Sequence, residues 1–408
     1  MKMLLIIFFA RKIWRRFLKF RNYMKTALIL IINFSIVFFF SCSSDKSTNI
    51  KIIDPGEIVE KKITLSEIAN EIIYIPLSNE ILCGEIYPEL TDNLIIIKPS
   101  REGLLAFDHN GKFKSRIGQR GKGPGEYLYA SKFTFDSKNK TIYILDISSK
   151  IIKYSMKGDF LQEIQLQNLG QKFFSEIIFS KNKIYLYEGI NQGYGKYDWI
   201  LIDTLGNLLF EKFNAIEEFP SFHGFIGNKQ ETYNNSLYYW NQINDTIFKI
   251  NGKKYEPAFL FAKGDFRFPK QKIKAFSTEY FFPHKIFFTK DYLFFSYNYH
   301  FQNCIGIYIK SEQQLYVINK TKDTEFPGIV NDIDGGLSFI PTSYYQNNKK
   351  EEFLVGDIIP LELKAHVASQ TFIESKTKYP EKKKELEKLA NSLNENDNPV
   401  MMLVKLKH

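Results

Sequence analysis

The stretch GLLAFDHNGKF, residues 103–113, has the pattern of a strand, a tight turn and a second strand. Apolar residues precede the turn, and Gly111 stands where a tight hairpin turn needs a positive φ angle. The pattern returns as KIIKYSMKGDF at 150–160, DWILIDTLGNL at 198–208 and DTIFKINGKK at 245–254, with the glycines 47, 48 and 46 residues apart. A period near 47 residues with four strands per unit is typical of propeller blades.

A fifth copy, QLYVINKTKD at 314–323, lacks the glycine. Short runs of β-branched and aromatic residues precede the hairpins, and we expect each to be the inner strand of a blade: 94–98, 141–146, 183–188, 236–240 and 292–297. Residues 336–375 are expected to hold a sixth, degraded blade. The sequence therefore predicts an all-β fold, a six-bladed β-propeller, with five blades as the alternative count.

Both ends of the domain contain a strand pattern that suits ring closure. A strand at 72–77 follows a short helical stretch at 65–70, and another strand at 400–406 ends the chain. One blade built from both strands would leave no open sheet edge. A helix at about 380–394 carries an apolar stripe, Leu386, Leu389, Ala390 and Leu393, and is expected to dock on the propeller. We therefore predict a single propeller domain over 59–408.

The charge distribution argues against nucleic acid as a partner. Lysine and arginine number 55 against 45 acidic residues, a net charge of +10. Eight of the basic residues lie in 1–41, which has no acidic residue, so the rest of the chain carries only +2. A nearly neutral body lacks the basic surface that binds phosphate backbones.

The N-terminal region has the pattern of an export signal. Residues 27–40 are uncharged and mostly apolar, a basic segment precedes them, and Ser41 and Cys42 follow. The run is too short for a comfortable membrane span. We predict a signal peptide over 1–41; since Met24 begins a conventional signal by itself, residues 1–23 are either a mis-assigned start or a long basic region. A plain membrane anchor or ordinary signal peptide is the alternative.

Cys42 stands where bacterial lipoprotein signals have the thiol that receives the lipid, a resemblance that predicts lipidation at Cys42. The polar segment that follows predicts a flexible tether over 42–58. The expected partner at this end is therefore a membrane, reached through the lipid.

The most distinctive motif is GQRGKGPGEY, residues 118–127, between two predicted strands. It lacks the spacing of a phosphate-binding loop or a dinucleotide fingerprint. Its glycines and proline predict a rigid path that brings the backbone close either to a neighbouring blade or to a ligand at the ring mouth. The candidate contact residues are Gly118, Arg120, Gly121, Lys122, Gly123, Pro124, Gly125, Glu126 and Tyr127.

This motif, with Asp136 and IYILD at 142–146, resembles the six-bladed β-propeller lipoproteins of Bacteroidota-type bacteria, which are distantly similar to NHL-repeat propellers. The segment ITLSEIANEIIYIPL at 63–77 and the closing DNPV at 397–400 extend the resemblance. It implies a propeller fold and an outer-membrane lipoprotein of the cell envelope, on either membrane face. It carries over no catalytic residue.

No catalytic pattern accompanies these features. The six histidines show no metal-ligand spacing, and no GxSxG elbow occurs, so we predict no catalytic residue, metal or cofactor. The favoured function is a non-catalytic binding or assembly scaffold with an envelope protein or glycan as partner. The alternative is a propeller enzyme, a metal-dependent lactonase or a glycan lyase or hydrolase, acting on a carbohydrate at the channel mouth.

Overall fold

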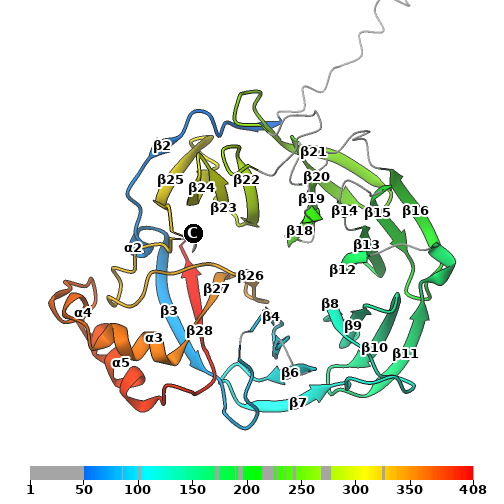
Figure 1. Ribbon diagram of the computed structural model, residues 1–408, viewed down its shortest axis with the longest axis horizontal. Helices are drawn as coiled ribbons and strands as arrows, with labels where there is room; N and C mark the ends of the chain where they lie inside the picture. The colour runs from blue at the N-terminus through cyan, green and yellow to red at the C-terminus, as the bar shows by residue number, and fades with distance from the viewer. Residues whose placement is uncertain are drawn as a thin grey trace, which may run out of the picture. The chain divides into compact units, whose positions relative to one another are not determined.

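Six sheets of four or five strands stand around a ring in the computed structural model, within the unit Lys51–His408 (Figure 1). The structure describes residues 50–407 except 85, 100–102, 171–173, 189, 192–195, 214–224, 227, 235, 242–244, 268–276 and 324–326. The predicted all-β class and the count of six blades are confirmed. Neither the signal peptide nor Cys42 lies among the described residues, so both stay predictions.

Blades one to three follow one another along the chain, and each runs from its innermost to its outermost strand. Blade one contains β4 (Pro88–Leu90), β5 (Ile95–Ile97), β6 (Leu104–Phe107) and β7 (Phe113–Ile117). Blade two contains β8 (Ala130–Asp136), β9 (Thr141–Asp146), β10 (Lys150–Ser155) and β11 (Phe160–Gln165). Blade three contains β12 (Phe174–Ser180), β13 (Lys183–Glu188), β15 (Tyr197–Ile202) and β16 (Leu208–Phe213).

Blades four and five each gain an outermost strand from the start of the domain, paired in parallel. Blade four contains β18 (Asn228–Tyr233), β19 (Ser236–Asn241), β20 (Thr246–Asn251), β21 (Lys254–Phe261) and then β1 (Lys51–Ile53). Blade five contains β22 (Phe282–Phe288), β23 (Tyr292–Tyr299), β24 (Gln302–Ile309), β25 (Gln314–Thr321) and then β2 (Val59–Glu60). Lys51–Ile53 thus form a strand within the 42–58 range that we expected to be a tether. A short ribbon pairs β14 (Ile190–Asn191) with β17 (Phe225–Ile226).

Blade six is made from both ends of the domain. Its strands run in the order β26 (Ser343–Gln346), β27 (Glu352–Ile358), β28 (Val400–Leu406) and β3 (Ala69–Pro76). Val400 pairs with Pro76 and Leu406 with Ala69, so the last strand of the chain joins the first long one antiparallel. The expected closing blade and the expected sixth blade are therefore one and the same sheet.

The runs expected to be inner strands are in fact the second strands of their blades. Every residue of β9 is buried, because both faces of a second strand pack against neighbouring blades. The innermost strand β8 contains Lys132 and Thr134 and is only partly buried. It therefore lacks the continuous apolar run by which β9 was found.

The fifth repeat was also placed one strand too late. Residues 314–321 form β25 alone, and the hairpin turn precedes that strand. Gln313 has a φ of 55°, so it adopts the positive-φ backbone that glycines supply in four of the other blades. A side chain other than glycine at this position concealed the turn.

Helices gather between β27 and β28 in the sequence (Figure 1). α5 (Pro380–Ser392) confirms the predicted helix, and its Leu386 and Ala390 are buried in a core cluster with residues of β3 and β28. α3 (Pro360–Val367) and α4 (Gln370–Glu374) were missed, since 336–375 was expected to hold strands only. A further short helix, α2 (Leu65–Ile68), precedes β3.

Two observations bear on anchoring and redox state. Among the described residues, no helix combines the length and the apolar character needed to cross a membrane. Cys83 and Cys304 are buried in separate core clusters and are not joined by a disulfide.

Candidate functional site

Residues 118–129 connect β7 of blade one to β8 of blade two, as the sequence predicted for a loop between blades. The loop folds back on itself, because the Gly121 N–H donates to Tyr127 O at 2.9 Å and the Tyr127 N–H donates to Gln119 O at 3.2 Å. These bonds give the connection a fixed backbone path.

Two of the glycines are required by close packing on blade two. Gly118 has a φ of 66° and Gly125 a φ of 72°, a region that other residues rarely adopt. A Cβ atom on Gly118 would lie 2.4 Å from the Tyr154 ring, and one on Gly125 would lie 2.8 Å from the Phe160 ring. The loop backbone therefore rests directly on aromatic side chains of β10 and β11.

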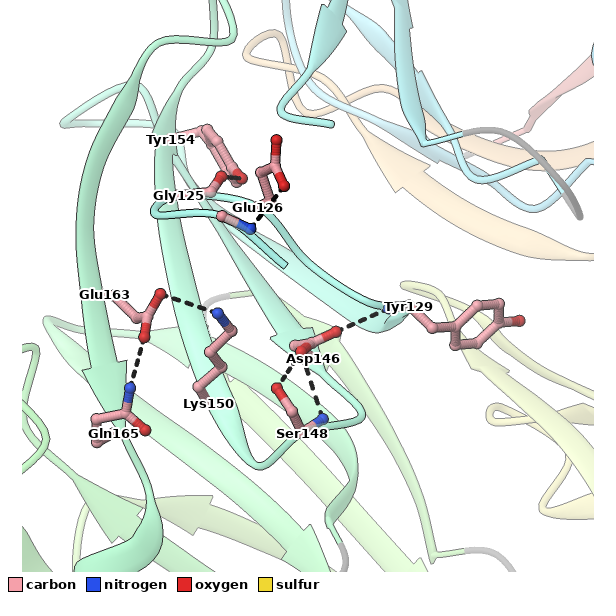
Figure 2. A network of polar contacts seen from close by, with 10 residues as sticks. Gly125, Glu126, Tyr129, Asp146, Ser148, Lys150, Tyr154, Glu163 and Gln165 are labelled. Carbon is pink, nitrogen blue, oxygen red and sulfur yellow. Dashed lines mark hydrogen bonds and ion pairs between the residues drawn. The ribbon is translucent and has the colours of Figure 1, made fainter. Parts of the chain in front are cut away.

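Two buried tyrosines, Tyr127 and Tyr154, fix the loop through hydrogen bonds of their hydroxyl groups. The Tyr127 hydroxyl accepts from the Leu104 N–H at 3.0 Å and donates to Ile117 O at 3.1 Å. The Tyr154 hydroxyl donates to Gly125 O (Figure 2). Burial raises the pKa of Tyr154, so its hydroxyl stays protonated and serves as a structural donor.

The Glu126 carboxylate closes the glycine-rich turn. It accepts from the Gly123 N–H at 2.7 Å and from the Gln119 side-chain amide. Hydrogen bonds from the Gly123 N–H and, to a smaller extent, from the Gln119 amide lower the pKa of Glu126. The carboxylate is therefore ionised, and it makes its hydrogen bonds within the loop. This geometry supports the first of the two interpretations of the motif, packing against a neighbouring blade, for most of its residues.

The remaining side chains of the motif face solvent. Gly125 and Tyr127 are buried, Gly118, Gly121, Gly123 and Glu126 are half-buried, and Arg120, Lys122 and Pro124 are exposed. The Arg120 Nε donates to Leu128 O at 3.0 Å, which directs the arginine along the loop.

Sequence reasoning missed the apolar neighbours of these exposed residues. Leu128 is 37% exposed, Tyr129 39% and Ile147 54%. The Tyr129 N–H donates to Asp146 Oδ1 at 2.8 Å, and the Ile147 N–H donates to Tyr129 O at 3.2 Å. The Tyr129 ring points away from Asp146 and the rest of this network (Figure 2). We call Arg120, Lys122, Pro124, Leu128, Tyr129 and Ile147 the contact surface.

A second group of charged side chains lies on the innermost strands of three consecutive blades. Lys132 on β8 pairs with Glu176 on β12 at 2.7 Å, and Glu89 on β4 lies within electrostatic reach of both. Desolvation by the surrounding inner strands raises the pKa of Glu89 to about 7, although the residue itself is exposed to solvent; the Lys132 ammonium opposes this rise and Glu176 adds to it. These residues are far apart in sequence, so no motif could have pointed to them.

In the described part of the chain, no three side chains of His, Cys, Asp or Glu gather closely enough to hold a metal ion. The six sheets and the blade shared by both ends define the class of protein, a six-bladed β-propeller. Within that class the chain belongs to the family described as Domain of unknown function (DUF4934), whose model matches residues 50–405.

Solved structures are similar to this chain at low identity. A "Putative exported protein" from Bacteroides fragilis is 17% identical, with a TM-score of 0.63, over 88% of this chain and 100% of that one. A protein of unknown function from Bacteroides thetaiotaomicron is 10% identical, with a TM-score of 0.43, over 85% and 75%. The WD40 β-propeller domain of Doa1 is 9% identical, with a TM-score of 0.39, over 69% and 93%. No curated protein sequence matches the chain.

Proposed function

We propose that this chain is a lipid-anchored protein of the cell envelope whose propeller binds a partner and catalyses no reaction. The observation that carries the proposal is the contact surface. Its outward side chains combine two cations, Arg120 and Lys122, with the apolar Leu128 and Tyr129 on a backbone that buried tyrosines hold in place. A surface already held in its bound shape loses little conformational entropy on binding, and arginine and tyrosine are enriched at interfaces.

The proposed location rests on the N-terminal pattern and on the family. The apolar run at 27–40 and Cys42 support export and lipidation, and the Bacteroides fragilis structure comes from a protein named as exported. We place the protein at the outer membrane. Labelling the full chain with a fatty-acid analogue in its native host, followed by membrane fractionation, should give a labelled protein in the outer membrane. A Cys42→Ala variant that is labelled as strongly as the wild type would refute the anchor.

The contact surface is tested with a charge-reversal pair and a matched control. Arg120→Glu with Lys122→Glu changes the surface, while Lys253→Glu with Lys254→Glu makes the same charge change at the exposed β20–β21 turn. Tagged full-length variants are purified from solubilised envelopes, and bound envelope proteins and glycans are identified by mass spectrometry. We expect a partner retained by the wild type and the control and lost from the first pair. Equal partner sets for both pairs would reject this surface.

Glu89 favours a second candidate function, an enzyme acting on a carbohydrate in the channel. A carboxyl group with a pKa of about 7 is half protonated near neutral pH and can act as a general acid, and Glu176 supplies a second carboxylate on the same wall. Incubation of the protein with envelope glycans tests this idea. Turnover with an apparent pKa near 7 that Glu89→Gln abolishes would establish the enzyme, and no turnover with the wild type would exclude it for those substrates.

A further inference from the structure

A pocket of about 330 Å³ opens at the end of the inner strands of blades two, three and four. Phe135 and Asp136 of β8, Phe179 and Ser180 of β12 and Thr232 of β18 line it, together with Ser137 and Lys181 from the adjoining turns. The contact surface adjoins the other end of β8, at Ala130. Six strand steps of about 3.3 Å separate the two ends by roughly 20 Å.

The Phe179 wall of the pocket is fixed in place. The Phe179 ring stacks on Tyr143, with centroids 5.2 Å apart and an interplanar angle of 12°. The Phe179 N–H donates to Thr134 Oγ1 at 3.0 Å, which ties its backbone to blade two. Phe135 and Phe179 are both only partly buried, so each leaves part of its ring available to a ligand.

The charged groups of the pocket are already occupied. Asp136 accepts from the N–H groups of Lys138 and Asn139 and from the Asn139 side-chain amide at 2.7 Å. The Lys181 ammonium donates to Asn251 Oδ1 at 3.2 Å. These bonds satisfy the buried Asp136 carboxylate and direct the solvent-exposed Lys181 ammonium toward Asn251, so neither charge needs a charged ligand as its partner, and a neutral ligand fits the pocket.

The hydroxyl groups remain available. Ser137, Ser180 and Thr232 form no intramolecular side-chain hydrogen bond within the described residues. Two aromatic faces beside several free hydroxyls suit a molecule with an apolar face and an equatorial rim of hydroxyl groups. A sugar ring has both features, because its C–H face packs on aromatic rings and its hydroxyls donate and accept hydrogen bonds.

We infer that this pocket binds a neutral sugar residue of a glycan, at a site separate from the contact surface. The inference goes beyond the proposed scaffold function, and its variants differ from those that test the contact surface. A failure of one proposal therefore leaves the other intact.

The test uses the purified full chain in a detergent without a sugar headgroup. Maltotetraose, cellotetraose, mannotriose and chitotetraose are the neutral probes, trigalacturonate is the charged comparator, and saturation-transfer NMR with calorimetry measures binding. We expect at least one neutral probe to bind, with an affinity that stays constant from about 50 to 500 mM salt, since charge pairing does not contribute.

Phe179→Ala should weaken that binding by about tenfold or more, as truncation of a central contact does. Thr232→Val and Ser180→Ala should each weaken it by about two- to fivefold and leave the melting temperature unchanged, which covers the case in which Phe179→Ala destabilises the blade. Phe213→Ala, on the outermost strand β16, is the matched aromatic control and should bind normally. Binding of no neutral probe, binding of trigalacturonate alone, or equal losses with Phe213→Ala would each overturn the inference.

Discussion

Two loops of this propeller differ in how far along the chain their contacts reach. The 118–129 loop bonds to residues nearby in sequence, such as Tyr154, 29 positions from Gly125. The loop at 331–336, which we call the closing loop, bonds across most of the domain. Asp332 accepts from Thr64 Oγ1 at 2.8 Å and from Ser66 Oγ at 2.7 Å, and Asp334 accepts from the Tyr74 hydroxyl at 2.9 Å.

The loop that is conspicuous in the sequence is therefore not the loop whose contacts hold the two ends of the domain together. The glycine-rich loop stood out in the sequence and joins two neighbouring blades. The closing loop was not singled out in the sequence, yet it bonds to α2 and to β3, the outermost strand of blade six, both from the start of the domain. We therefore expect damage to ring closure to affect the whole fold, and damage to the 118–129 loop to act more locally.

Removal of residues 400–408 should have the largest effect. β28 lies between β27 and β3, so its loss leaves two unpaired edges and opens the cores that Val400 and Met401 help to fill. We expect no cooperative thermal unfolding and loss of the near-ultraviolet circular dichroism signal. Removal of His408 alone is the control. A cooperative transition at the wild-type temperature in the longer deletion would show that the ring does not depend on this closure.

Gly125→Val should come next, with a loss of about 3 kcal/mol or more in the free energy of unfolding, from its left-handed backbone and the clash with Phe160. Gly123→Val is the comparison. Its φ is not left-handed and a Cβ would meet only the Glu126 carboxylate, at 3.0 Å, so the loss should be smaller. Urea unfolding measures both. Equal losses would contradict the packing described for Gly125.

Asp332→Ala should lower the free energy of unfolding by about 2–3 kcal/mol, because it removes three hydrogen bonds and leaves the Ser66 N–H without its acceptor. Asp108→Ala is a matched local control. Asp108 accepts from the Asn110 and Lys112 N–H groups of its own hairpin turn, each at 3.0 Å, and lies 3.8 Å from Lys114 Nζ on the next strand, so all these partners are local and its loss should cost about 1 kcal/mol. A larger loss for Asp108 would reverse the comparison between local and long-range loops.

The smallest effect is a pH dependence of opposite sign at the two closing-loop carboxylates. Burial would raise the pKa of Asp332, but hydrogen bonds from Ser66 and Thr64 outweigh it and lower the pKa, so its stabilisation fades as pH falls below 3.8. Burial raises the pKa of Asp334 despite its bonds to Gly336, Tyr74 and Asn331, so its contribution is lost as pH rises above 3.8.

Urea midpoints of Asp332→Asn and Asp334→Asn across the acid range test these signs. Asp332→Asn should flatten the rise of stability with pH below 3.8, and Asp334→Asn should remove a decline above it. The same slope in both variants would show that the two carboxylates share one environment.

Much of the fold followed from local patterns. The second strands, such as β9 and β13, were found because they are buried on both faces and contain continuous apolar residues. The hairpin glycines marked the turns, since a positive φ has a strong residue preference. β28 and α5 were also located, the former by its apolar run and the latter by its apolar stripe.

The tertiary structure decided what depends on contacts between distant residues. The sequence by itself determined the propeller class and the repeat, because the spacing of the blades and the burial of their second strands both appear as local patterns of residues. It could not place the innermost strands, whose polar residues such as Lys132 lack that period, nor bring Glu89 beside Lys132 and Glu176. The pocket forms only where strands of separate blades meet, and the contacts of the closing loop form only when the two ends of the domain come together. The spacing of residues in the sequence predicts neither.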